Sequence, residues 1–384
     1  MSSHVYYFDY AAATPIDQAV IEAMKPYLTD KFYNPSAQYL AAKEVAQNID
    51  TSRRQLADVL GIRSSEVIFT AGGTESNNLA VQGILKQFPE GRVVLSAIEH
   101  DSVRKPAQQY SYNEAKVDYS GILDLDSVKE SITEKTVLVS VMTANNEIGT
   151  IQPIKEVSEL IKKVRNHRVA SGNSLPIYLH TDASQAGNYL RLQPKTMGVD
   201  MMTINGGKLY GPKQTGMLFV RSGVVIKPIV LGGGQELGLR NGTENVAGIV
   251  GFCQAVTIAQ SKHNEERNRL KDLQEYFINS LGEKLPSANI NGHRQRRLPN
   301  NVHITIPGKD NERLMMILDE KGIQVAVGSA CSASHDEPSH VLKAIGLSDQ
   351  DARASLRFSM GRSTTKDVID YAITQLVSAC KVLT

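Results

Sequence analysis

The hydrophobic pattern of the chain alternates short apolar runs with helical segments between about residues 60 and 225. The apolar runs are 66–69, 92–95, 136–142, 177–180, 201–204 and 216–220, and helical patterns near 75–86, 101–109 and 153–165 lie between them. Strands that are apolar on both faces and separated by helices are typical of a mostly parallel sheet covered on both sides. The pattern therefore predicts an α/β fold with helices on both faces of its main sheet.

The pattern changes after about residue 250. Residues 247–284 predict one long helix that connects two domains, and the last hundred residues mix strands at 301–306 and 354–359 with helices. This mixture predicts a smaller α+β domain. The polar stretch 165–175, RNHRVASGNSL, predicts a loop.

Composition narrows the class of protein. The chain has 384 residues, 41% of them hydrophobic, which is enough for two domains. Its 42 basic and 40 acidic residues indicate neither a nucleic-acid nor a membrane partner, and no apolar run approaches the ~18 residues of a membrane span. The N-terminus lacks a signal-peptide pattern, and three cysteines are too few for a disulfide framework. We therefore expect a cytoplasmic protein.

Polar residues follow the predicted strands, where parallel sheets bind ligands. The run Thr70-Ala-Gly-Gly-Thr-Glu-Ser-Asn-Asn78 places glycines and the Thr74 hydroxyl before a helix N-terminus. Such a turn can hold a phosphate through Gly73 and Thr74, although an ordinary capped turn has the same pattern. No G-x-G-x-x-G dinucleotide motif is present.

The later strands end in residues with distinct chemistry. His100, Asn146, Asp182 and Lys208 each follow an apolar run. A carboxylate directly after an apolar strand is costly to bury without a partner, and a protonated ring nitrogen is one such partner. A Walker A loop at the Gly-rich stretch would need Gly at 202 and Ser or Thr at 209, but Met202 and Leu209 occupy those positions. Metal-ligand spacings are weak, so we predict no metal site.

One cofactor, pyridoxal 5'-phosphate, satisfies these strand ends together. Its phosphate suits the Thr74 turn, and its ring nitrogen suits Asp182, which would keep that nitrogen protonated. Its ring oxygen suits Gln185 or an asparagine, and its flat face suits His100. Its aldehyde needs an amine, which we assign to Lys208 rather than to Lys213 in the following turn.

With these residues the chain resembles the cysteine desulfurases, a family of fold-type I, class V aminotransferase-like pyridoxal-phosphate enzymes. The matching motifs run nearly end to end: Phe8-Asp-Tyr-Ala-Ala-Ala-Thr-Pro15, Asn34-Pro-Ser36, Thr74-Glu-Ser-Asn-Asn78, Glu99-His100, Asn145-Asn-Glu-Ile-Gly149, His180-Thr-Asp-Ala-Ser-Gln185, Lys208-Leu-Tyr-Gly-Pro-Lys213, Gly232-Gly-Gly-Gln-Glu236, Arg240-Asn-Gly-Thr-Glu-Asn245, Gly328-Ser-Ala-Cys331 and Ser355-Leu-Arg-Phe-Ser359. The resemblance implies a seven-stranded main sheet in a large domain at 16–257. It also implies a small domain at 1–15 and 258–384 that carries the catalytic cysteine and the substrate arginine.

The resemblance also implies residue roles. Lys208 would hold the cofactor and move the Cα proton of L-cysteine, and Cys331 would be the nucleophile that becomes a persulfide while L-alanine is released. Arg357 and Asn34 would bind the substrate, and Thr243 would reach the phosphate of a neighbouring subunit in a homodimer. His100 would stack on the ring and protonate or deprotonate at the substrate sulfur. The Gly-Ser-Ala-Cys loop resembles the subgroup that passes sulfur to iron–sulfur cluster or tRNA-thiolation acceptor proteins.

The stretch before Lys208 departs from the family pattern. Asn205 and Gly207 stand where the family usually has Ser and His. We therefore expect the Asn205 amide and the Gly207 N–H to help hold the phosphate. A selenocysteine lyase, an aminotransferase or a catalytically weakened sulfur-pathway scaffold are the alternative functions, and the Gly-Ser-Ala-Cys loop argues against transamination.

Overall fold

The computed structural model describes residues 5–328 and 337–383, and its main feature is a seven-stranded sheet. The strands are β2 (Val67–Thr70), β3 (Arg92–Ser96), β4 (Tyr112–Ala115), β5 (Thr136–Ser140), β6 (Tyr178–Asp182), β7 (Met201–Asn205) and β8 (Gly216–Val220), in the spatial order β2-β8-β7-β6-β5-β3-β4. Strand β8 runs opposite to the other six strands and pairs antiparallel with β2 and β7, and all other pairs in this sheet are parallel. The predicted mostly parallel sheet is confirmed, with the polar edge strand β4 as an addition that no apolar run indicated.

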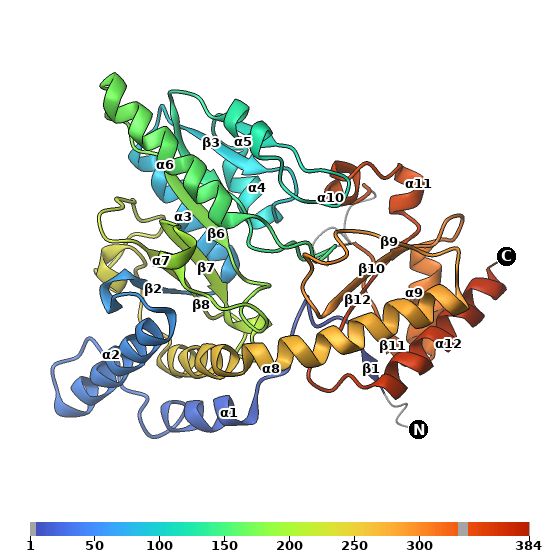
Figure 1. Ribbon diagram of the computed structural model, residues 1–384. Helices are drawn as coiled ribbons and strands as arrows, with labels where there is room; N and C mark the ends of the chain where they lie inside the picture. Colours follow the sequence, from blue (N-terminus) through green and yellow to red (C-terminus); the bar gives the residue numbers. More distant parts are fainter. Residues whose placement is uncertain (1–4, 329–336, 384) are drawn as a thin grey trace.

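Helices cover both faces of this sheet (Figure 1). The helices α3 (Gly73–Gln87) and α4 (Asp101–Ala107) pack on one face, and α2 (Leu40–Leu60), α5 (Leu125–Ser131), α6 (Ile154–Ser171) and the first part of α8 (Val246–Lys284) pack on the other. Neighbouring strand residues point to opposite faces, so Ile68 joins the α3 core and Phe69 joins the α8 core. Both faces are therefore dry, which explains why these strands are apolar throughout.

The predicted loop at 165–175 is wrong over most of its length. Helix α6 continues to Ser171 and ends at Gly172, whose φ of 76° is the left-handed conformation that glycine adopts readily. Within this segment the buried Arg168 donates hydrogen bonds to the carbonyl groups of Thr133, before β5, and of Thr136, the first residue of β5. The polar pattern therefore belongs to the exposed end of a helix in which Arg168 is buried, and not to a loop.

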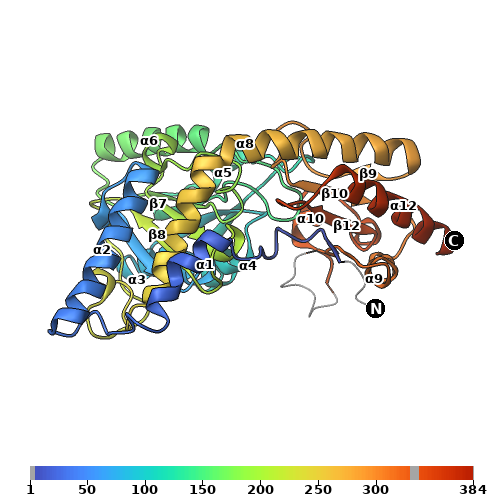
Figure 2. The same cartoon turned by 90° about the horizontal axis from the view of Figure 1, so that it is seen from below.

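A second core surrounds a smaller sheet of β9 (Asn289–Ile290), β10 (Asn301–Thr305) and β12 (Ser355–Ser359). Helices α9 (Asn311–Glu320), α12 (Lys366–Val382) and the later part of α8 pack there, and α8 runs from one core to the other (Figure 2). Near the N-terminus, β1 (Tyr6–Tyr7) pairs with β11 (Ile323–Gln324), and Phe8 is buried in the second core. The domain boundaries at 15/16 and 257/258 stay predictions.

The remaining elements are short. They are α1 (Gln18–Met24), η1 (Lys25–Tyr27), η2 (Ser64–Glu66), α7 (Pro194–Met197), η3 (Gly206–Lys208), η4 (Glu236–Gly238), α10 (His340–Ala344) and α11 (Asp349–Ala352). Within the two described ranges, no helix is both long and apolar enough to span a bilayer.

Candidate active site

A cavity lies at the carboxyl ends of the parallel strands. Its walls come from the segments that follow β2, β3, β5, β6 and β7, and they consist of Gly73, Thr74, Asn77, His100, Ser102, Met142, Ala144, Asn146, Asp182, Ser184, Gln185, Asn205 and Lys208. Eight of the predicted site residues therefore meet in one place: Gly73, Thr74, His100, Asn146, Asp182, Gln185, Asn205 and Lys208. Parallel strands that begin at one edge of the sheet and end at the other bring these distant residues together.

Asp182 is the buried charge of this cavity. Its carboxylate accepts hydrogen bonds from Asn77 Nδ2 at 2.7 Å and from the Ser184 N–H at 2.9 Å. Burial on its own raises the pKa of Asp182, but these hydrogen bonds and the positive charge of Lys208 outweigh it and hold the pKa below its ordinary value. The residue is therefore a carboxylate at neutral pH, ready to pair with a protonated ring nitrogen.

The turn between β2 and α3 presents bare backbone. Gly72 has a φ of 126°, and a Cβ on Gly73 would lie 3.1 Å from Ser184 Oγ and 3.3 Å from Asn205 Nδ2. Residues other than glycine rarely adopt the φ of Gly72. A side chain at Gly73 would require Ser184 and Asn205 to move. The first N–H groups of α3 and the Thr74 hydroxyl therefore form a cradle suited to an anion.

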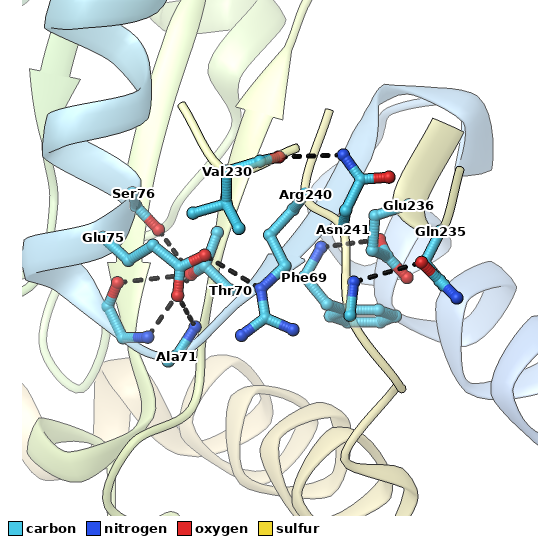
Figure 3. A network of polar contacts seen from close by, with 12 residues as sticks. Phe69, Thr70, Ala71, Glu75, Ser76, Val230, Gln235, Glu236, Arg240 and Asn241 are labelled. Carbon is cyan, nitrogen blue, oxygen red and sulfur yellow. Dashed lines mark hydrogen bonds and ion pairs between the residues drawn. The ribbon is translucent and has the colours of Figure 1, made fainter. Parts of the chain in front are cut away.

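A polar network holds this turn from behind (Figure 3). Glu75 accepts hydrogen bonds from the Ala71 N–H at 2.7 Å and from Arg240 Nε at 2.8 Å. Glu236 accepts from the Phe69 N–H at 2.8 Å and forms an ion pair with Arg53 at 2.6 Å. The loop at 230–242 thus fixes both the end of β2 and the start of α3, which limits movement of the anion cradle.

The predicted cofactor anchor Lys208 ends η3, directly after β7. Its own carbonyl accepts a hydrogen bond from Asn188 Nδ2 at 2.8 Å, which holds the backbone beside the cavity. The Gly207 N–H donates to Asn205 Oδ1 at 3.1 Å, so this N–H is used within the chain, and Gly207 is absent from the cavity walls. The Asn205 amide nitrogen faces the Gly73 turn, and its phosphate role stays a prediction.

His100 caps the start of α4 beside the cavity. Its Nδ1 accepts a hydrogen bond from the Ser102 N–H at 3.1 Å and lies 2.8 Å from Ser102 Oγ. Burial is the main cause that lowers the pKa of His100, and the charge of Lys208 adds to it, whereas Asp182 and Asp101 oppose it. The ring is therefore neutral at neutral pH.

The two residues that were predicted to bind the substrate do not line this cavity. Arg357 on β12 is 2% exposed and donates to Asp9 Oδ1 at 2.6 Å and to the Asn146 carbonyl at 2.8 Å, so only its neighbour Asn146 reaches the cavity wall. Asn34 lies in an exposed loop and accepts from the Ser36 N–H at 2.9 Å.

The other two predicted residues also lie elsewhere. Thr243 lines a separate cavity with Thr70, Gln214 and Arg240, on the far side of the anion cradle. Cys331 falls within 329–336, outside the described residues.

The sequence analysis missed five residues of the cavity wall: Asn77, Ser102, Met142, Ala144 and Ser184. Asn77 and Ser102 matter most, because they contact Asp182 and His100. Asn77 is fully buried and donates to Ser102 Oγ at 2.8 Å as well as to Asp182. The only sequence signal was position: Asn77 lies one helical turn after the Gly73-Thr74 turn, and Ser102 lies two residues after His100. Their contacts join residues 25 and 105 positions apart, which no local pattern shows.

The residues present fit pyridoxal 5'-phosphate. The bare cradle at Gly73 suits a phosphate, the Asp182 carboxylate suits a ring nitrogen, and Lys208 supplies an amine in the same cavity. Gln185 lines the wall between them and uses one of its N–H groups on the Ala11 carbonyl at 3.0 Å, which leaves the other for a ring oxygen.

Comparison with known proteins agrees with this fit. The sequence model of the aminotransferase class-V family matches residues 6–371. The chain belongs to this family. Members of the family depend on pyridoxal 5'-phosphate, so the predicted cofactor is confirmed.

Individual relatives of this family member are cysteine desulfurases. It is 42% identical over 371 residues to cysteine desulfurase IscS 1 of Archaeoglobus fulgidus (95% of this chain, 94% of the relative). It is 40% identical over 374 residues to cysteine desulfurase IscS of Dictyoglomus turgidum (96% of this chain, 92% of the relative). A solved structure described as a NifS-like protein aligns with a TM-score of 0.90 at 30% identity, covering 99% of this chain and 100% of that one. The resemblance inferred from the motifs is therefore confirmed.

Proposed function

We propose that this class-V enzyme is a cysteine desulfurase, which converts L-cysteine to L-alanine and leaves the sulfur as a persulfide on Cys331. The observation that carries the proposal is the meeting of Lys208, Asp182 and His100 in one cavity of a chain whose full-length relatives are named for this reaction. The presence of Cys331 in a Gly-Ser-Ala-Cys sequence supplies the thiol that the reaction requires.

Pyridoxal 5'-phosphate held by Lys208 and Asp182 would supply the electron sink that makes the Cα proton of L-cysteine acidic. Asp182 holds the proton on the ring nitrogen, and Lys208 removes the Cα proton and returns one to the product. The Cys331 thiolate attacks the substrate sulfur, so a sulfur–sulfur bond forms while the carbon–sulfur bond breaks. Each turnover therefore converts one L-cysteine and one Cys331 thiol to one L-alanine and one persulfide, with no external oxidant or reductant.

Arg357 is the proposed partner of the substrate carboxylate. Two of its nitrogens are engaged by Asp9 and Asn146, and its Nε has no hydrogen-bond partner among the residues that the structure describes. A buried N–H without a partner is costly, and a carboxylate would satisfy it. We also propose that Asn34 contacts the substrate and that Thr243 and the Asn205 amide contact the cofactor phosphate.

We also propose that the enzyme works as a homodimer. Large apolar side chains are exposed around α1 and α2, in the loop before η4 and in η4 itself: Leu28, Phe32, Tyr39, Leu40, Val230, Leu231 and Leu237. Exposed apolar groups of this kind mark interaction surfaces, and Thr243 would then serve the cofactor of the neighbouring subunit. A sulfur-acceptor protein is the proposed second partner. We propose a cytoplasmic location from the small number of cysteines. Sedimentation equilibrium at micromolar concentration tests the dimer.

The test of the function is an assay of alanine and persulfide formation from L-cysteine without a keto acid. We expect activity in the wild type, loss of persulfide formation in Cys331→Ala, and retention of the visible absorbance of the lysine-bound cofactor in that variant. The buried Cys380→Ala is the matched control for removal of a thiol and should remain active. Full activity of Cys331→Ala would remove Cys331 as the nucleophile. Formation of alanine only in the presence of a keto acid would indicate an aminotransferase. A preference for L-selenocysteine over L-cysteine would indicate a selenocysteine lyase. Failure to take up the cofactor would indicate a scaffold protein.

A further inference from the structure

The side chains of Asn77 and Ser102 connect the two groups that face the cofactor, Asp182 and His100. The chain of contacts runs from Asp182 Oδ2 to Asn77 Nδ2 (2.7 Å), from Asn77 Nδ2 to Ser102 Oγ (2.8 Å), and from Ser102 Oγ to His100 Nδ1 (2.8 Å). Asn77 is fully buried and Ser102 is 8% exposed, so water does not compete for these contacts. The direction of each hydrogen bond can therefore be worked out from its neighbours.

Asp182 sets the direction at one end. A carboxylate only accepts hydrogen bonds, so the Asn77 amide must turn its nitrogen toward Asp182, because the reverse orientation would place two oxygens against each other. Asn77 Nδ2 then uses its second hydrogen on Ser102 Oγ. The Ser102 hydroxyl keeps its own hydrogen, which is available for His100 Nδ1 at 2.8 Å.

The backbone sets the same direction at the other end. The Ser102 N–H, in the first turn of α4, also donates to His100 Nδ1 at 3.1 Å. Two donors thus face one ring nitrogen, which must carry a lone pair. A neutral imidazole has a single N–H, so the hydrogen lies on Nε2.

We propose that Asn77 and Ser102 are positioning residues that hold His100 as its Nε2–H tautomer, which makes His100 a hydrogen-bond donor to the bound substrate rather than its general base. The basic nitrogen, Nδ1, is occupied by Ser102, and Nε2 already carries a hydrogen. No proton transfer from His100 is required, since its Nε2–H can donate a hydrogen bond to the substrate sulfur while the carbon–sulfur bond breaks and the sulfur–sulfur bond forms. The tautomer stands on hydrogen-bond geometry alone, and only its use toward a substrate sulfur rests on the proposed function.

Burial and the positive charge of Lys208 favour the neutral form of His100, whereas the carboxylates Asp182 and Asp101 oppose it. Asp101 and the titratable His340 approach the ring from α4 and α10, Asp182 from β6 and Lys208 from η3. Because hydrogen bonds donated to Nδ1 favour the unprotonated nitrogen, removal of the Ser102 hydroxyl should raise the pKa of His100.

The decisive test measures the ring nitrogens of His100 by NMR in cofactor-free protein labelled with ¹⁵N-histidine. The chain has nine histidines, and His100→Gln identifies the signals of interest. We expect the wild type to show an unprotonated Nδ1 and a protonated Nε2. Ser102→Ala should shift both signals toward a mixture of tautomers and raise the titration midpoint, whereas Ser102→Thr should restore the wild-type pattern. Ser158→Ala, which removes a hydroxyl bonded to the distant Gly198 carbonyl, is the matched control.

Steady-state kinetics supply the second readout. For Ser102→Ala we expect kcat to fall about tenfold, less than the full 10²–10⁴-fold of a lost acid–base group, with KM changed less than about twofold. A protonated Nδ1 in the wild type, or unchanged ring signals in a folded Ser102→Ala, would overturn the inference. If the expected tautomer were found in a protein without desulfurase activity, the proposed function would fail and the inference about His100 would stand.

Discussion

The cofactor side and the substrate side of this site are built in different ways. On the cofactor side, Asp182, Lys208 and His100 each follow a strand of one sheet, and their side chains line one cavity. On the substrate side, Arg357 comes from the smaller sheet and is held by Asp9 near the N-terminus and by the Asn146 carbonyl. The cofactor side therefore needs one sheet to form, whereas the substrate side needs three segments far apart in the chain to meet.

This difference predicts that substitutions on the two sides of the site have different effects on cofactor binding and substrate binding. Asn146 belongs to both sides, because its side chain lies in the cavity wall while its carbonyl accepts from Arg357. It therefore links the small sheet directly to the cavity wall. We therefore expect variants on the cofactor side to alter cofactor binding and catalysis together, and variants on the substrate side to alter substrate binding alone.

The largest expected effect is that of Asp182→Asn. The variant keeps the shape of the side chain and an oxygen for Asn77, but it loses the charge that holds the ring nitrogen protonated. We expect kcat to fall by about 10²–10⁴-fold and cofactor affinity to weaken by about 2 kcal/mol or more. Stopped-time alanine assays and cofactor titration followed by absorbance measure both quantities. An unchanged kcat in the fully loaded variant would contradict the assigned role of Asp182.

An intermediate effect is expected for Arg357→Lys. Lysine keeps a positive charge near Asp9 but lacks the planar fork and the Nε donor. We expect KM for L-cysteine to rise by about 10- to 100-fold, which corresponds to one lost charge-assisted hydrogen bond, with the cofactor dissociation constant changed less than about twofold.

Two results would contradict the expected difference between the cofactor side and the substrate side. If Arg357→Lys weakened cofactor binding as much as Asp182→Asn does, the two sides would not be separable. If it lowered stability while KM stayed constant, Arg357 would be only a structural link between Asp9 and Asn146.

The smallest expected effect is a change of stability with pH, caused by one buried histidine on each side of the site. His180, which contacts Ser140 and Thr203 under the cofactor cavity, has its pKa lowered to about 4 by burial, an effect that Asp182 partly offsets. His303, the strand partner of Arg357, has its pKa lowered to about 3 by burial and by the charges of Arg297 and Arg357. Both stay neutral in the folded protein near neutral pH.

The pH dependence of stability follows from these directions. Both folded-state pKa values lie below the unfolded value of about 6.5, so their contribution to stability is present above pH 6.5 and is lost as pH falls toward 4 and 3. From pH 7 to pH 6 we expect a loss of less than about 1 kcal/mol for each histidine, measured by urea unfolding of the cofactor-free protein. His303→Gln should reduce this loss, and the exposed His167→Gln should leave it unchanged. A stability that rises on acidification over this range would contradict the assignment.

Local patterns were sufficient where chemistry follows a strand directly. The apolar runs that became β2, β3, β5, β6, β7 and β8 located the strand ends, and the residues after them suggested the cofactor. Patterns failed where an element is polar for a tertiary reason. Edge strand β4 has no apolar run. The end of α6 includes the polar Arg168, because this side chain donates hydrogen bonds to the carbonyl groups of Thr133 and Thr136.

The sequence by itself determined the α/β architecture and the cofactor, and it predicts Lys208 as the anchor, because hydrophobic period and strand-end chemistry are local properties of the chain. Only the tertiary structure decided that Asn77 and Ser102 direct the hydrogen of His100, and that Arg357 is shared between Asp9 and Asn146. The physical reason is the same in both cases. The direction of a buried hydrogen bond depends on every donor and acceptor around it, and those partners come from segments that meet only when the chain has folded.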